Sequence, residues 1–358
     1  MPRRSPRKNV RDVLNAMWET LDHEDELGVS EETGIISADI LMQLKIRVHA
    51  LEIDPLGDVS MTIDDSPFLF DILLESDLRQ HPLPEEMDSF HEYPELSESP
   101  ETESSGAERP ETESLEAESL RAESLRAESL RAESLRAESL RAETESPEGS
   151  HDLSWASEAR ARAVSDYITD FALNPSRKNL PPSCRNLGEH VGLSPISLPD
   201  PFLLGNGLDC TGIWFWRTQL LLEAKKRENG QPSRPHIIMT TIVNRVGQND
   251  SILYEELVPL VSAMRNRANQ PEVPPAKWES LFEMDEQKLP DNRVFKDEKT
   301  FPVLMLSFLG PQHARVFYAR MKNDEVIIGQ SELYSFERKN TANIELFARL
   351  LLSTPVRE

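Results

Sequence analysis

The spacing of apolar residues predicts three helices near the start of the chain. Residues 10–21 place an apolar residue every three or four positions, which gives one helical face. A second helix is expected to follow Ser37, and residues 64–78 begin with a Ser-Pro pair typical of a third helix start. The second helix would carry on one side the residues Ile40, Leu41, Leu44, Val48 and Leu51.

Residues 64–78 allow two interpretations. As part of a small helical bundle, the segment would expose its acidic residues along a solvated edge. Its mixture of acidic and apolar residues is also typical of segments that fold into a groove on a partner, including transcriptional activation segments. Under that interpretation the partner-binding side chains are Phe68, Leu69, Ile72 and Leu73. We therefore expect residues 1–80 to form an acidic arm that binds a protein partner.

Residues 81–150 are rich in Glu, Ser, Pro and Thr, and we expect them to form a disordered, low-complexity linker. They include five copies of Glu-Ser-Leu-Arg-Ala, from Glu118 to Ala142. Successive leucines would lie about 140° apart around a helix, so this coiled-coil-like repeat forms no apolar stripe. Glu and Arg three residues apart favour a fluctuating, solvated helix that acts as a spacer. Recent duplication without a role for single residues also explains the repeat.

Residues 151–358 predict the compact domain of the chain. Their pattern of strands and helices indicates an α+β or α/β fold, with a mostly antiparallel sheet and flanking helices. The final helix is expected to start after a cap at Asn340. The predicted helices are 155–173 and 251–268, and the predicted strands are 236–246, 303–308, 314–321 and 325–329.

The stretch LDCTGIWFWRTQLLLEAKK, residues 208–226, is open to more than one structure. A single helix over residues 211–228 would bury the two tryptophans and would place Lys225, Lys226 and Arg227 at its C-terminal end. The same residues are also compatible with two strands, 212–217 and 219–225. In either case the stretch opens the compact domain.

Charge divides the chain unevenly. The net charge is −24, and the first 150 residues hold 37 acidic and 14 basic residues, so the remainder is close to neutral. Such an acidic excess repels the phosphates of nucleic acids and favours basic partners. The nearly neutral remainder does not repel phosphates in this way, so nucleic-acid binding stays open. Cys184 and Cys210 have no spacing typical of a disulfide framework or a zinc site. No segment resembles a signal peptide or a membrane span, so we expect a soluble protein of the cytoplasm or nucleus.

Asp209, Glu223 and Lys225 match the order Asp, then Glu-x-Lys, and the match resembles the signature of the PD-(D/E)XK nuclease superfamily. The resemblance implies that Asp209 and Glu223 would hold Mg²⁺ and that Lys225 would help position the attacking water. Carboxylates suit Mg²⁺, which can lower the pKa of bound water. Leu208 stands where the family has proline, and a loop rather than a helix follows the motif.

Four further blocks resemble a group of functionally uncharacterised filamentous-fungal proteins: IWFWRTQLLLEAKK, RPHIIMTT, FPVLMLSFLGPQHARV and ELYSFERKNTANIELFARLLLSTP. This likeness covers about residues 208–355 and implies a self-contained domain without a known activity. The sequence contains no G-x-S-x-G elbow, Walker loop or G-x-G-x-x-G. We therefore expect a non-catalytic interaction or scaffold protein without a cofactor. A Mg²⁺-dependent nuclease and a transcriptional regulator are the alternatives.

Overall fold

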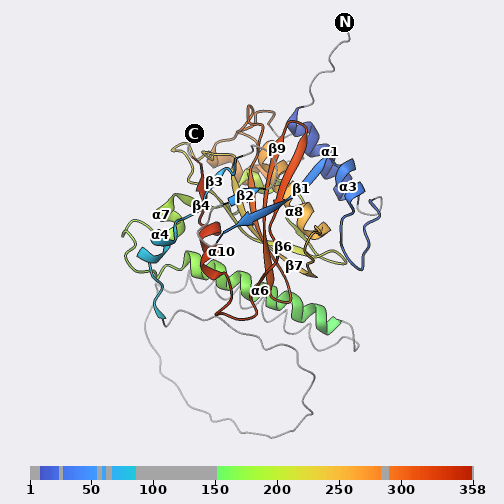
Figure 1. The fold of residues 1–358 in the computed structure, drawn as a ribbon. Coiled ribbons are helices and arrows are strands. Elements are labelled where there is room, and N and C mark those ends of the chain that lie inside the picture. Colours follow the sequence, from blue (N-terminus) through green and yellow to red (C-terminus); the bar gives the residue numbers. More distant parts are fainter. Residues whose placement is uncertain are drawn as a thin grey trace, which may run out of the picture. The chain divides into compact units, whose positions relative to one another are not determined.

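A computed structural model describes residues 9–23, 27–54, 59–61, 67–85, 151–283 and 290–356. Nearly all of the predicted linker, including its pentapeptide repeat, lies outside these residues. Two compact units divide the chain, Met1–Tyr93 with Ser154–Glu358, and Pro94–Leu153. All strands belong to the first unit, which Figure 1 shows as a sheet with helices around it.

A mixed, ten-stranded sheet forms the centre of this unit. Its main path runs β2-β1-β10-β9-β8-β7-β6-β4, with β11 paired to β9 and β5 paired to β6. The described strand pairs are antiparallel except β1–β10 and β7–β8. The strands are β1 (Ile46–Ile53), β2 (Val59–Met61), β4 (Leu193–Pro195), β5 (Asp209–Cys210), β6 (Trp216–Ala224), β7 (Ile237–Val246), β8 (Val303–Gly310), β9 (His313–Lys322), β10 (Glu325–Gln330) and β11 (Tyr334–Ser335).

The central strands bury side chains on both faces of the sheet. In β7 and β8, Met239 and Met305 belong to one apolar cluster, whereas Ile238 and Leu304 belong to the other. This alternation follows from the two-residue period of a strand. Helices contribute to both clusters, so these strands read as nearly continuous apolar runs.

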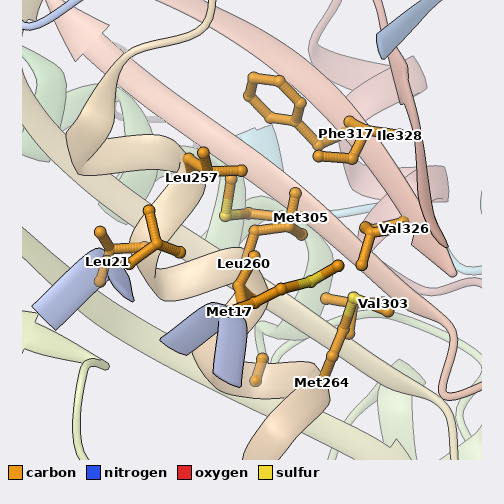
Figure 2. Packing of buried hydrophobic residues seen from close by; sticks show 14 of the residues in the cluster. Met17, Leu21, Leu257, Leu260, Met264, Val303, Met305, Phe317, Val326 and Ile328 are labelled. Atoms are coloured by element: carbon orange, nitrogen blue, oxygen red, sulfur yellow. The ribbon is translucent and has the colours of Figure 1, made fainter. Parts of the chain in front are cut away.

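The first cluster is built mainly around α8 (Tyr254–Asn269), which connects the parallel strands β7 and β8. Helix α1 (Val10–Asp22) packs against α8, and α3 (Ala38–Gln43) adds Ile40 to the same cluster. Figure 2 shows Leu21 of α1 near Leu257 of α8, and Met17 of α1 near Leu260. The amphipathic face predicted for residues 10–21 is therefore confirmed, and its contact is the central helix.

The second cluster receives α6 (His151–Leu173) and α10 (Ile344–Leu351), together with α4 (Glu75–Gln80) and α7 (Leu187–Val191). A separate two-stranded sheet pairs β3 (Phe70–Asp71) with β12 (Thr354–Pro355). The unit also contains two short 3-10 helices, η3 (Pro201–Leu204) and η4 (Pro275–Lys277), and the short α-helix α9 (Trp278–Leu281). The predicted α+β class with flanking helices is confirmed.

Several local predictions were wrong. The second helix ends at Gln43 instead of reaching residue 51, because Lys45 takes φ 55 and the chain continues as β1. The described part of the third predicted helix, residues 67–78, holds the short strand β3 and the start of α4 instead of one long helix. The last helix starts after Asn343 rather than Asn340.

The stretch that was open between helix and strands is largely strand. The single helix over residues 211–228 is wrong, because β6 runs from Trp216 to Ala224. The predicted strand 219–225 lies almost entirely within β6, which has a register shift between Thr218 and Leu220. The predicted strand 212–217 shares only its last two residues with β6, since residues 212–215 are not strand. Trp214 and Trp216 are buried in the first cluster. Their apolar surface is covered from α8, where Tyr254 lies against both rings.

Elements of the predicted acidic arm pack with elements of residues 151–358. Residues up to Tyr93 cluster with Ser154–Glu358, and β1 pairs in parallel with β10. The physical reason is that neither α1 nor β1 can bury its apolar face alone. Among the described residues, no helix has the length and apolar character needed to cross a membrane.

Candidate functional site

The structure separates the two carboxylates of the predicted nuclease motif. Asp209 pairs with Arg217 across β5 and β6, whereas Glu223 lies six residues farther along β6. At about 3.3 Å per residue, this corresponds to roughly 20 Å between their backbone positions. One metal ion cannot bridge carboxylates on positions so far apart. No group of three or more His, Cys, Asp or Glu side chains in the described part of the chain is arranged to hold a metal.

Asp209 has a local structural role. Its Oδ1 accepts a hydrogen bond from the backbone N–H of Thr218 at 2.7 Å, and the Thr218 hydroxyl donates to the carbonyl of Leu208 at 2.7 Å. These bonds lie beside the register shift after Thr218. A bulge leaves backbone groups outside the regular ladder. The Asp209 carboxylate satisfies one of these groups.

Both carboxylate oxygens of Glu223 face cations of the same chain. Arg267 Nη2 donates to Oε2 at 2.7 Å, and Lys226 Nζ lies 3.5 Å from Oε1. The Glu223 and Arg267 side chains are 1 % and 0 % exposed. A metal ion would have to displace two cations from a buried carboxylate to bind here.

These residues belong to a larger cluster that we call the Glu223 network. Lys226 also reaches Asp200 Oδ2 at 2.6 Å, and its ammonium lies 4.4 Å from the ring centre of Trp278. Arg267 Nη1 donates to Gln270 Oε1 at 2.6 Å. The network consists of Asp200, Glu223, Lys226, Arg267 and Gln270. Two negative and two positive charges neutralise one another, which fits a structural connection between β6 and the end of α8.

Lys225, the residue of the predicted motif, takes no part in this network. Its side chain is exposed, and its backbone N–H donates to the carbonyl of Gly192 at 2.8 Å. The neighbouring Lys226 makes the ion pairs instead. The motif therefore identified a charged cluster, but the strand pairing and the register of β6 determine which members meet.

Two more ion pairs fix the start of α8, and sequence reasoning missed both. Arg315 of β9 forms a bidentate pair with Glu256 and also donates to the carbonyls of Gln248 and Ser251. Arg245 pairs with Glu255, whose pKa is raised by burial. An available signal was the presence of arginines inside otherwise apolar strands, since buried arginines need partners.

The predicted partner-binding side chains Phe68, Leu69, Ile72 and Leu73 pack against the second core cluster. Phe68 lies 4.8 Å from Tyr318 between ring centres, and Arg349 donates to the carbonyl of Leu73 at 2.6 Å. The apolar side chains of this segment therefore contribute to the core of the same chain. Partner binding through them stays a prediction.

His236 lies beneath this segment. Its ring meets the ring of Phe70 edge-on, with 5.1 Å between ring centres. Burial lowers the pKa of His236 to about 4, while the charge of Glu298 opposes that shift. The imidazole is therefore neutral near pH 7 and serves the packing of β3.

An acidic cavity, which we call the β1 cavity, lies beside the end of β1. Its volume is about 660 Å³, and its lining comes from residues 48–53, 249–250, 330–332 and Tyr334. The pairing of β1 with β10 stops at Ala50 and Gln330, whereas residues 51–53 continue to pair with β2. Strand β10 also ends at this point, so the cavity opens where the β1–β10 ladder stops.

Three carboxylates line the β1 cavity: Glu52, Asp250 and Glu332. All three residues are exposed, and no Lys or Arg occurs among the described residues of the lining. The pKa of Tyr334 is raised by burial and, secondarily, by Glu332, which places this negative charge near the phenol. The cavity thus attracts cations rather than anions.

No protein-family model, curated protein or solved structure matches this chain. The resemblances to the nuclease superfamily and to the fungal proteins therefore stay predictions. Any functional conclusion has to come from the chain's own geometry.

Proposed function

We propose that this chain is a non-catalytic interaction protein that binds a basic segment of a protein partner in the β1 cavity. The observation that carries the proposal is the grouping of Glu52, Asp250 and Glu332 around a cavity whose described lining includes His49 but no Lys or Arg. Strand β1 belongs to the acidic arm for which the sequence predicts a partner. The net charge of −24 adds attraction for a basic partner at long range.

The distribution of charges supports binding over catalysis. The carboxylates with catalytic potential, Glu223 and Glu256, are buried and paired with arginines of the same chain. Exposed carboxylates around an open cavity provide electrostatic recognition without a positioned nucleophile or base.

The test uses the full chain and a ten-residue peptide of alternating lysine and serine, with fluorescence anisotropy as the readout. The cavity variant is Glu52→Gln with Asp250→Asn and Glu332→Gln. Because an exposed charge pair contributes up to about 1 kcal/mol, we expect the three changes to weaken peptide binding about tenfold or more.

The matched control removes three carboxylates from the repeat, through Glu118→Gln, Glu123→Gln and Glu128→Gln. This control changes the net charge equally, and we expect it to alter the affinity less than about twofold. Equal losses in the two variants, or equal binding of a glutamate-serine peptide, would overturn the proposal.

A further inference from the structure

A second cavity of about 670 Å³ lies where the end of α1 approaches the loop between η3 and β5. The loop supplies Gly205, Asn206 and Gly207, and we call this space the loop cavity. Its volume is within the usual range of about 300–1,000 Å³ for small-molecule sites. None of the residues of the β1 cavity lines it.

The wall of the loop cavity is fixed against α8. Gly207 has φ +87, and a Cβ there would lie 2.1 Å from Ser262 Oγ. A Cβ on Gly205 would lie 1.6 Å from Asn266 Oδ1. Trp216 Nε1 donates to the carbonyl of Gly207 at 3.1 Å. Only glycine permits this close approach of loop and helix, which gives a preformed wall.

Much of the remaining lining is apolar or aromatic, and includes Leu203, Leu208 and Val258. Tyr254 donates its hydroxyl to the carbonyl of Leu21 at 2.6 Å, and the indole N–H of Trp216 is bonded to the loop. Both rings are nevertheless almost fully buried, with Trp216 4 % and Tyr254 2 % exposed, so they support the wall of the cavity from behind. The apolar body of a ligand would contact mainly Leu198 and Leu203, which are the more exposed apolar residues of the lining.

The charged groups in the described lining are Asp22 and Asp209, and both residues are exposed. Asp22 is the last residue of α1, whose last turn holds no basic residue. A carboxylate at this negative end of the helix dipole is unfavourable, and a bound cation would offset the repulsion. The hydrogen bond from Thr218 holds the Asp209 carboxylate at the cavity.

We infer that the loop cavity binds an organic cation, an amine or quaternary ammonium with an apolar body. The apolar lining would receive the body, while Asp22 and Asp209 would neutralise the charge. This inference goes beyond the proposed binding of a basic partner, because it concerns a separate cavity with its own residues.

The test uses the full chain and benzyltrimethylammonium as the probe, with benzyl alcohol as the neutral comparison, in isothermal titration calorimetry. Because two carboxylates line the cavity, we expect the cation to bind about tenfold more tightly than the alcohol. The variant Asp22→Asn with Asp209→Asn should weaken binding of the cation about tenfold, with little effect on benzyl alcohol. Asparagine at residue 209 retains an acceptor for Thr218, so the fold should persist.

The matched control is Glu272→Gln with Glu279→Gln, which removes two exposed carboxylates that line neither the loop cavity nor the β1 cavity. This control should leave binding of the ammonium probe unchanged. Leu198→Lys, at an exposed position of the lining, should abolish it by placing a cation there. Equal binding of the two probes, or equal loss in the two double variants, would overturn the inference without affecting the peptide result.

Discussion

The Glu223 network and the β1 cavity contain the same kind of charged group in opposite settings. Glu223 is almost fully buried, and each of its oxygens faces a cation of the same chain. Glu52, Asp250 and Glu332 are exposed around a cavity whose described lining contains no Lys or Arg. Buried ion pairs within the chain make the first group structural, whereas the side chains of the second group are exposed to solvent and can be reached by another molecule. Residue type alone does not distinguish these roles.

The largest expected effect is on the Glu223 network. Arg267→Met removes the guanidinium and leaves a buried carboxylate with Lys226 as its nearest cation. We expect the free energy of unfolding in urea to fall by about 3–5 kcal/mol. Arg217→Met on the exposed side of the same strand should change it by less than about 0.5 kcal/mol. Similar losses of stability in the two variants would show that burial of the arginine does not determine how much it stabilises the fold.

His236 extends the comparison to a buried group that is neutral. Because burial lowers its pKa from 6.5 to about 4, its stabilising contribution is complete above pH 6.5 and is lost as the pH falls towards 4. The loss can reach roughly 3 kcal/mol, and His236→Phe should remove this part of the pH dependence in urea titrations.

The buried carboxyl of Glu255 should change the stability with pH in the opposite direction to His236. Burial raises its pKa, so its contribution is present below the unfolded value near 4.5 and declines as the pH rises through the folded value. An unchanged stability profile after His236→Phe would show that protonation of His236 does not drive the loss in acid.

The β1 cavity should give the opposite result from the Glu223 network. The triple variant of Glu52, Asp250 and Glu332 removes exposed charges, so we expect the free energy of unfolding to change by no more than about 0.5 kcal/mol. The same protein should lose about tenfold in peptide affinity. A large loss of stability would place these carboxylates with the structural group.

The smallest expected effect concerns the metal alternative. Millimolar Mg²⁺ should raise the melting temperature by less than about 1 °C, because binding at Glu223 would have to displace Arg267 and Lys226. Asp209→Ala should leave this response unchanged. Metal-dependent stabilisation that disappears in Asp209→Ala, with DNA cleavage in the parent chain, would restore the nuclease alternative.

Much of the fold could be predicted because its periodic signals were unambiguous. Residues 236–246 and 303–308 read as buried strands, and residues 10–21 and 251–268 read as helices. Residues 208–226 were ambiguous because strand β6 carries bulky residues at successive positions and also contains a bulge. Val48 and Leu51 fitted a helical face, but Lys45 turns the chain out of that helix.

The sites were less predictable than the fold. The sequence places Lys225 and Lys226 side by side, and only the register of β6 directs Lys226 towards Glu223 and Asp200. The β1 cavity unites residues near positions 50, 250 and 332, and no local pattern connects these three segments. The parallel pairing of β1 with β10 brings the first and last of these segments together. Hydrogen bonds from Gln330 to Ser251 and from Leu333 to Asn249 add the third, so the cavity is a tertiary property.

That pairing also has a consequence for the order of folding during synthesis. Ile46 leaves the ribosome about 280 residues before its partner Val326. The sheet cannot acquire its complete order until β10 has been made, and until then β1 has an exposed edge that can associate wrongly. A chain truncated after residue 300 would lack β10 and leave this edge of β1 unpaired, so we expect it to aggregate more readily than the full chain.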